Sequence, residues 1–391
     1  MKISFITTVF NEEKSIDKFL KSLFAQSKLP DEIVIVDGGS TDKTIERIAN
    51  CELRIKKKRV IFKLIIKRGN RAVGRNEAIR KATGDVIACS DSGNVLDKKW
   101  FENIIKPFGF AQGKPFKNVD VVAGYYKGLA KNIFQKCLIP YALVMPDKVN
   151  PDTFLPATRS VAFTKAIWKK ARGFDERYSH NEDYVFANRL KEMGAKIVFA
   201  KDAVVHWIPR DSFKEAFVMF SRFAFGDAEA GIWRPKVLLL FARYLIGSSL
   251  LLFSVLHRSF MLIVLVGISL ILYLLWSLWK NYRYVKNSQA FLILPLLQLT
   301  SDMAVLAGTV LAFLRTFFFK WIAMFFILSL LIFISFRVLR KMFPLPEINQ
   351  EKIVGYSQYY GYPLYFDTIL FFTFLLLPIV TFILCKKIFK K

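Results

Sequence analysis

The feature that most constrains the fold of this chain is a long apolar run in its second half. Residues 260–279 contain no charged side chain, and about twenty such residues make a helix long enough to cross a bilayer. Residues 237–256 form a similar run with one charge, Arg243, which we expect to reach the membrane surface or to face protein. The chain is therefore predicted to enter a membrane as helices from about residue 236.

Three more apolar runs leave the number of membrane spans open. Residues 321–336 and 368–385 carry no charge, whereas residues 287–314 contain Asp302 near their middle. This last segment is expected to span, to re-enter or to lie in the interface. If it spans, there are five helices and the C-terminal lysines lie outside. If it is interfacial, there are four, the tyrosine-rich residues 340–367 form an external loop, and the lysines lie inside, as the positive-inside rule prefers.

Positive charge accompanies these runs. The net charge is +27, but much of the excess flanks the apolar segments, as at Lys280, Arg283 and Lys286, so no nucleic-acid partner is predicted. The basic soluble part suits an anionic lipid surface and a nucleotide-diphosphate ligand. Residues 1–10 lack the apolar core and cleavage site of a signal peptide. We therefore expect a multi-pass protein of the cell membrane with a cytoplasmic soluble part.

The first 125 residues alternate between strand and helix patterns. Apolar, β-branched segments predict strands at 2–9, 32–36, 60–66, 86–89 and 119–125. The helices predicted between them are 12–26, with Asn11 as its cap, 43–50, 73–82 and 100–106. Such alternation predicts a parallel sheet with helices on both faces.

The order is looser after residue 125. The predicted elements are helices at 133–144, 165–172 and 182–193 and short strands at 160–163, 196–199 and 203–207, with a loop at 145–158. Residues 212–226 predict an amphipathic helix that suits the membrane surface or, alternatively, packs on the α/β core. We accordingly divide the chain into an α/β domain (1–210), an amphipathic interface helix (211–235) and a membrane helical region (236–391).

Polar residues follow the predicted strands. Asp91 stands at the carboxyl end of strand 86–89, and ligands of open α/β sheets bind beyond such ends. An aspartate there can hold a metal ion or a ribose, or it can simply cap the helix that begins near Asp97. The single motif does not decide between these roles.

Several short motifs are more specific together than any one of them is alone. They are residues 4–13, residues 33–44 with the turn Asp37-Gly-Gly-Ser-Thr-Asp42, residues 73–78 and 82–85, Ser90-Asp-Ser-Gly93, Gly173-Phe-Asp175 and Asn181-Glu-Asp183. Over residues 2–230 the chain resembles the family 2 glycosyltransferases of the GT-A fold. The resemblance implies an α/β, Rossmann-like nucleotide-diphospho-sugar transferase domain, followed here by a C-terminal transmembrane region of four to five helices.

The resemblance also implies a site for a nucleotide-sugar donor. The strand ends and the Asp37 turn would hold the nucleotide of a UDP- or GDP-sugar, and Arg75 and Asn76 would lie beside its pyrophosphate at a helix start. The implied donor residues are Thr8, Val9, Asn11, Glu12, Asp37, Gly39, Ser40, Arg75, Asn76, Asp91 and Ser92. The alternative for Arg75 is a solvated surface charge.

The family's Asp-x-Asp pair, which binds ribose and a divalent metal, is incomplete here. Asp91-Ser-Gly93 keeps the first aspartate, whereas Gly93 brings no ligand. A Mg²⁺ or Mn²⁺ ion that stabilises the departing nucleotide would rest on Asp91, with Asn94 or His206 as a further ligand. A structural role is the alternative for His206.

The resemblance makes Asp183 the general base of an inverting transfer. Its carboxylate would take the proton from the acceptor hydroxyl, on the side of the sugar opposite the leaving group. Glu182 would orient the loop or the acceptor, and Arg159 and Ser160 are weaker candidates for contact with the donor sugar or the acceptor. No covalent intermediate is required.

The leading prediction is a membrane-bound inverting glycosyltransferase, of hexosyltransferase type, that serves a lipid-linked or envelope-glycan acceptor at the cytoplasmic face. A processive polysaccharide synthase is an alternative, but the Gln-x-x-Arg-Trp signature of such enzymes is reduced here to Arg222. Gly93 favours a second alternative, a non-catalytic membrane protein with a degenerate site.

Overall fold

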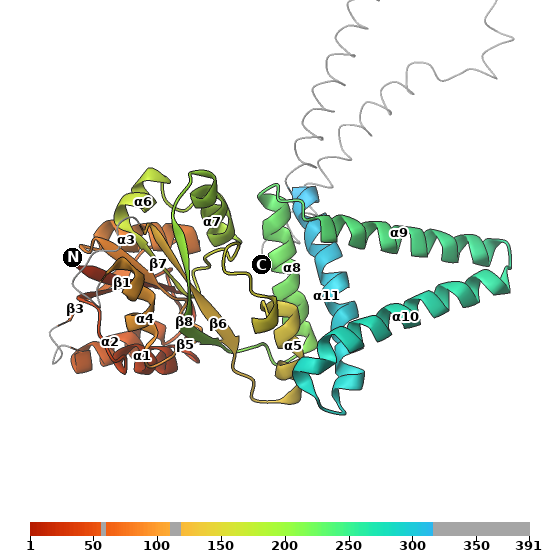
Figure 1. Cartoon of the computed structure of the whole chain (residues 1–391), viewed down its shortest axis with the longest axis horizontal. Coiled ribbons are helices and arrows are strands. Elements are labelled where there is room, and N and C mark those ends of the chain that lie inside the picture. The colour runs from red at the N-terminus through yellow and green to blue at the C-terminus, as the bar shows by residue number, and fades with distance from the viewer. Residues whose placement is uncertain (56–59, 110–118, 316–391) are drawn as a thin grey trace, which may run out of the picture. The chain divides into compact units, whose positions relative to one another are not determined.

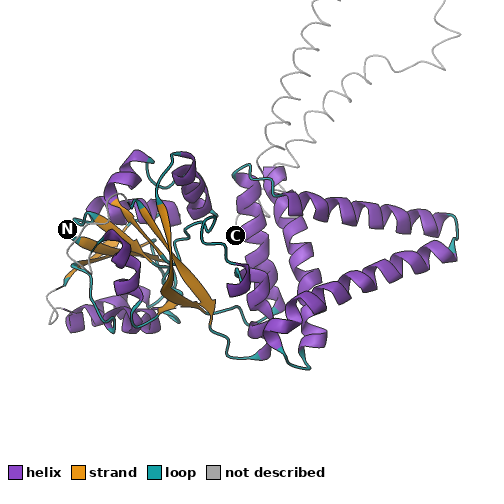
Figure 2. Cartoon of the chain, viewed as in Figure 1, coloured by secondary structure: helices purple, strands orange, loops and turns teal. Residues whose placement is uncertain are grey.

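The computed structural model describes residues 1–55, 60–109 and 119–315. Within them an α/β region is followed by long helices (Figure 1, Figure 2). The apolar runs 321–336 and 368–385, the tyrosine-rich residues 340–367 and the C-terminal lysines lie outside the described residues. The two counts of membrane spans therefore both stay predictions.

The described strands form one mixed sheet in the order β3-β2-β1-β4-β7-β6-β8-β5. The strands are β1 Ile3–Val9, β2 Glu32–Asp37, β3 Ile61–Ile66, β4 Val86–Cys89, β5 Asn94–Leu96, β6 Val121–Gly128, β7 Val161–Thr164 and β8 Ile197–Trp207. Strands β3, β2, β1 and β4 are parallel, β7 is antiparallel to both β4 and β6, and β5 is antiparallel to β8.

The strands predicted up to residue 125 do run parallel, because β6 and β4 are both antiparallel to β7, but the sheet as a whole is mixed and the order of strands beyond β4 was not predicted. Strand β6 does not pair with β4, because β7 from much later in the chain occupies that edge, with Val161 opposite Cys89. Strand β5 was not predicted, since three residues are too few to show a period. The predicted strands 196–199 and 203–207 form the single strand β8, which pairs with β6 through an irregularity at Gly124 and Tyr125.

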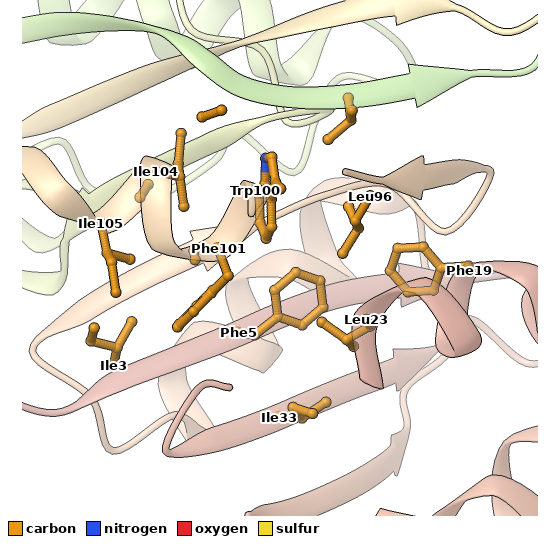
Figure 3. Packing of buried hydrophobic residues seen from close by; sticks show 14 of the residues in the cluster. Ile3, Phe5, Phe19, Leu23, Ile33, Leu96, Trp100, Phe101, Ile104 and Ile105 are labelled. Atoms are coloured by element: carbon orange, nitrogen blue, oxygen red, sulfur yellow. The ribbon is translucent and has the colours of Figure 1, made fainter. Parts of the chain in front are cut away.

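Helices cover both faces of the sheet, as the alternation predicted. The helices of this region are α1 Ile16–Phe24, α2 Thr44–Ile55, α3 Arg71–Lys81, α4 Trp100–Ile105, α5 Ile133–Ala142, α6 Lys165–Lys170, α7 Glu182–Glu192 and α8 Phe213–Glu229. Helices α1, α2 and α4 pack on one face, and α3, α6 and α7 pack on the other (Figure 1). Phe5 of β1 meets Trp100 of α4 edge to face at 5.8 Å in the first of these cores (Figure 3).

The predicted helix cap at Asn11 is wrong. Helix α1 begins at Ile16, and its preceding residue is Ser15. Asn11 has a left-handed φ of 54° and its Oδ1 accepts from the Thr41 N–H at 2.9 Å. The side chain therefore ties the loop after β1 to the loop after β2, instead of capping a helix.

Three described helices are long and apolar enough to cross a membrane: α9 Pro235–Leu256, α10 Phe260–Val285 and α11 Ala290–Phe313. Helix α11 is more covered by protein than the other two, because 28% of its most apolar window is buried, against 6% for each of them. A Cβ on Gly308 would lie 2.2 Å from the Ser221 carbonyl oxygen, so α11 and α8 touch at the backbone. Apolar residues of α8, α5 and α11 form a third core cluster.

Candidate active site

The carboxyl ends of β1 and β2 are tied together by hydrogen bonds. The Asn11 N–H donates to Ser40 Oγ at 2.9 Å, and the Glu12 N–H donates to Thr44 Oγ1 at 2.8 Å. Asp37 is fully buried and its Oδ1 accepts from the N–H groups of Gly39 and Ser40, both at 2.8 Å. The Asp37 turn is thus shaped by its own carboxylate, and its predicted contact with a nucleotide base stays a prediction.

The loop after β4 joins the same edge of the sheet. Ser92 Oγ donates to the Thr8 carbonyl at 3.3 Å, and the Gly38 N–H donates to the Val9 carbonyl at 2.8 Å. The structure therefore brings together the β1 end, the Asp37 turn and the Asp91 loop, which the sequence predicted to share a donor site.

Arg75 lies at the centre of the site. Helix α3 begins beside β1, so closely that a Cβ on Gly74 would lie 2.8 Å from Thr8 Cγ2. The adjoining guanidinium of Arg75 is almost fully buried, with its Nη2 2.9 Å from Asp91 Oδ1 and its Nη1 bound to Glu182 Oε1. One arginine therefore joins the loop after β4 to the start of α7.

The two aspartates of this cluster differ in protonation behaviour. Burial raises the pKa of Asp91, but the positive charges of Arg75 and Arg71 outweigh it and leave the pKa below its usual range. Burial and then the charge of Glu182 raise the pKa of Asp183 above its usual range, against a smaller lowering by Arg75. Environments that separate two carboxyl pKa values are typical of sites that use one of them as a base.

Asp183 has hydrogen-bond donors around it but no directly bound cation in the described residues. Its Oδ1 accepts from the Tyr184 N–H at 2.9 Å, and its Oδ2 accepts from Thr158 Oγ1 at 3.3 Å. Glu182 is buried and bound to Arg75, and the orienting role that the sequence suggested for it stays a prediction.

Arg75 and Asn76 are occupied by protein groups instead of facing an open pyrophosphate site. Asn76 is buried, its Nδ2 donates to the Phe174 carbonyl at 2.8 Å, and its Oδ1 accepts from the Phe174 N–H at 2.9 Å. Its amide therefore supports the segment that leads to α7, and the structure assigns Arg75 to Asp91 and Glu182.

His206 lies on β8 beside Asp97, with its Nε2 4.0 Å from Asp97 Oδ2. Burial lowers the pKa of His206, and Asp97 offsets only part of this. Asn94 Nδ2 lies 3.4 Å from Ser90 Oγ, and the ligand role of Asn94 beside Asp91 stays a prediction. In residues 1–55, 60–109 and 119–315 there is no group of three or more His, Cys, Asp or Glu side chains that could hold a metal.

Sequence reasoning gave too little weight to Arg159 and overlooked Arg71. The Arg159 guanidinium lies between the rings of Tyr126 and Trp207, at 5.5 and 5.4 Å from their centroids. Its positive charge lowers the pKa of both Asp91 and Asp183, although in each case it is a lesser influence than burial. The basic loop 67–71 signalled Arg71 in the sequence, whereas nothing in the sequence signalled the aromatic stack around Arg159.

The comparisons with known proteins agree with this arrangement. Residues 4–131 match the model of the family described as Glycosyl transferase family 2. The O-antigen chain rhamnosyltransferase RfbN of Salmonella typhimurium is 23% identical over 230 residues, which are 56% of this chain and 71% of that protein. The poly-β-1,6-N-acetyl-D-glucosamine synthase of Staphylococcus epidermidis is 32% identical over 97 residues, which are 24% of this chain and only 22% of the synthase.

A solved structure extends the similarity of fold. The mannosyltransferase PcManGT from Pyrobaculum calidifontis, in complex with GDP-Man and Mn²⁺, has a TM-score of 0.57 and 17% sequence identity. The similarity covers 81% of this chain and 88% of that one. The predicted GT-A fold of the α/β domain is thereby confirmed.

Proposed function

Since this chain belongs to glycosyltransferase family 2, we propose that it is a membrane-bound inverting transferase. It moves one sugar from a nucleotide-diphosphate donor to a lipid-linked or envelope-glycan acceptor. The observation that carries this proposal is Asp183, a carboxylate with a raised pKa held in one cluster with Asp91. RfbN, by its name, acts on an O-antigen chain, and PcManGT binds GDP-Man, which supports this class of acceptor and donor.

Arg159 and Arg71 are the groups we assign to the donor diphosphate. Both charges act on Asp91, and Arg71 is the first residue of α3, where a helix N-terminus favours anions. Arg75 is already neutralised by two carboxylates. We therefore assign to Arg159 and Arg71 the contact with the diphosphate that the sequence predicted for Arg75.

A divalent metal fits this site through one protein ligand, Asp91. Asp91 has one oxygen on Arg75, its side chain is 39% exposed, and its second oxygen can serve as a ligand. Mg²⁺ is commonly held by one or two carboxylates together with substrate phosphates. When bound, the ion would neutralise charge on the departing diphosphate, and Asp91 would be the residue of this chain that holds it.

The proposed transfer needs one proton acceptor. Asp183 takes the proton of the acceptor hydroxyl while that oxygen forms a bond to the anomeric carbon. The bond from that carbon to the donor diphosphate breaks on the opposite side, so the configuration inverts. Thr158 and the Tyr184 N–H hold the Asp183 carboxylate in place for this step.

The catalytic domain is proposed to face the cytoplasm. Basic and aromatic residues cluster at the start of α9 and the end of α10, where Lys280 lies over the Trp276 ring at 4.7 Å and its charge interacts with that of Lys236. Such residues are typical of the cytoplasmic end of membrane helices. The turn between α9 and α10, at the other end of this hairpin, has fewer positive charges.

The test is nucleotide release from a panel of UDP- and GDP-sugars by membranes that contain the full chain, with and without Mn²⁺. Asp183→Asn is expected to lower kcat by about 10²–10⁴-fold, the range for a lost general base. The control is Asp152→Asn, an exposed loop residue, which should match the parent. Asp183→Asn with parental turnover would refute the proposal, and long polymeric products would show a processive synthase instead.

A further inference from the structure

The segment that carries Glu182 and Asp183 is fastened to α8, the helix that precedes the membrane region. Asn181 Nδ2 donates to the Phe223 carbonyl and to Asp227 Oδ1, both at 2.9 Å. Two residues earlier, Ser179 Oγ donates to Glu229 Oε2 at 3.0 Å. Each of these partners lies on α8, so the approach to α7 is bonded to that helix along two of its turns.

Asn181 occupies an unusual position for such contacts. It immediately precedes α7, where an asparagine side chain normally accepts from the first turn of its own helix. Here it makes no such bond, and its backbone has a left-handed φ of 57°. Asparagine tolerates this conformation better than most residues. Its side chain is therefore available to bond to α8, immediately before Glu182 and Asp183 in the chain.

Close packing reinforces the hydrogen bonds. A Cβ on Gly226 would lie 2.8 Å from His180 Cβ and 3.1 Å from Asn181 Cγ, so only glycine lets α8 approach this closely. Asp227 is held in turn by Arg234, whose Nε is 2.6 Å from Asp227 Oδ2. The Arg234 guanidinium also lies over the Tyr184 ring at 4.4 Å.

Arg234 is the residue before α9, the first long apolar helix. Contacts therefore run without a break from that helix through Arg234 and Asp227 to Asn181, the residue before Glu182. We propose that Asn181 and Asp227 are positioning residues that fix the catalytic Asp183 relative to the membrane helices. The geometry of the base then depends on how α8 and α9 are seated. This inference rests on the proposed function, because it requires Asp183 to be the base.

The test uses the full chain in membranes and the donor found in the panel described above. Asn181→Gly keeps the left-handed backbone accessible and removes both bonds to α8. It is expected to lower kcat by about 10²-fold, as a small misplacement of a catalytic group does, while the donor KM stays within about twofold of the parent. Asp227→Ala should act in the same direction, and the double variant should lose no more than the more impaired single variant.

Two further measurements separate positioning from general damage. The acid limb of the kcat profile should move in Asn181→Gly, because a displaced Asp183 leaves the surroundings that perturb its pKa. The control Asn188→Ala removes an asparagine of α7 whose Nδ2 donates within that helix, to the Tyr184 carbonyl at 2.8 Å, and should match the parent. Gly226→Ala, which deletes no hydrogen bond, should lower kcat as well, so it replaces Asn181→Gly if that variant does not fold.

Parental kcat in Asn181→Gly or Gly226→Ala, or additive losses in the double variant, would overturn the inference. A donor KM that rises in step with the loss of kcat would also overturn it. Asp183→Asn distinguishes the two proposals. If it is fully active, the proposed function fails; if it is inactive while Asn181→Gly equals the parent, only the positioning role fails.

Discussion

Among the arginine–carboxylate contacts of the described residues, one cluster in the α/β domain and one among the apolar helices can be compared. In the first, Arg75 bridges Asp91 and Glu182. In the second, Arg243 of α9 pairs with Asp302 of α11 at 3.1 Å. The sequence left open whether Arg243 reaches the membrane surface or faces protein. In the structure it faces protein, since its guanidinium contacts a carboxylate and lies over the Tyr273 ring at 3.8 Å.

The clusters differ in how fully their carboxylates are used. Asp302 is nearly buried and accepts from Arg243, Tyr244, Tyr273 and Gln298, all within 3.1 Å. Asp91 keeps one oxygen without an arginine partner and is 39% exposed. A saturated carboxylate can only hold helices together, whereas one with spare capacity can bind a ligand. By this criterion the Asp302 cluster is structural, whereas the Asp91 cluster has room for the proposed ligand.

The largest effect is expected from Arg75→Met. It leaves Glu182 charged, buried and without its partner, and breaking a buried ion pair in this way costs about 3–5 kcal/mol. Activity should be lost together with stability, because Asp91 is released as well. Thermal unfolding and nucleotide release of the same preparation measure both. Full activity would show that the arginine is not what assembles the site.

Asp302→Asn should have a smaller effect, and on stability alone. Hydrogen bonds between apolar helices contribute about 1 kcal/mol each, and an amide at position 302 can still accept from Arg243, Tyr244 and Tyr273. We expect a lower Tm with kcat and the donor KM unchanged. Loss of turnover at unchanged Tm would contradict this expectation, since it would show that the Asp302 cluster has a chemical role.

Asp183→Asn should raise Tm although it lowers kcat. A carboxyl group whose pKa is higher in the folded than in the unfolded chain binds its proton more tightly when folded. Its contribution to stability is present at low pH and is lost as pH rises through the folded pKa. The gain in Tm should therefore be present at neutral pH and vanish in acid, where both forms are uncharged. A gain that is independent of pH would contradict this cause.

The smallest effect is expected from Gly93→Asp. A Cβ at Gly93 meets no atom within 4 Å, so the side chain should fit without a change in Tm. It adds a carboxylate two residues from Asp91, and the Mn²⁺ concentration for half-maximal turnover should fall. An unchanged metal response would show that position 93 does not face the ion. Asn132→Asp, at an exposed helix cap whose Oδ1 accepts from the Gln135 N–H, is the control for added charge.

Much of the fold of residues 1–89 could be predicted from the sequence because its signals are local. Strand β2 is apolar throughout apart from its ends and β4 is entirely buried, so each shows its character within a few residues. The place of β7 between β4 and β6 could not be predicted, since it depends on a pairing of Cys89 with Val161 across a long stretch of chain. Motif order identified Asp91 and Asp183 as candidates in the same way.

The side chains that contact those aspartates could not be predicted from the sequence, for the same physical reason. Arg75 and Glu182 are 107 residues apart, and a basic residue at a helix start looks alike in sequence whether it meets a phosphate or a buried carboxylate. Asn76 resembled a ligand-binding residue, and only its bonds to Phe174 show where its amide is used. Short-range patterns thus located the site but did not assign the contacts inside it.

The antiparallel strand β7 has a consequence for how such proteins can diversify. Strands β3, β2, β1 and β4 come from the continuous residues 1–89, and every later strand is added beyond β4. The seam between β4 and β7, where Cys89 faces Val161, is therefore a natural joint for recombination. Because Asp91 and Asp183 both follow Cys89 in the chain, an exchange at this joint would keep the Asp37 turn and Arg75 but would replace both of these aspartates together.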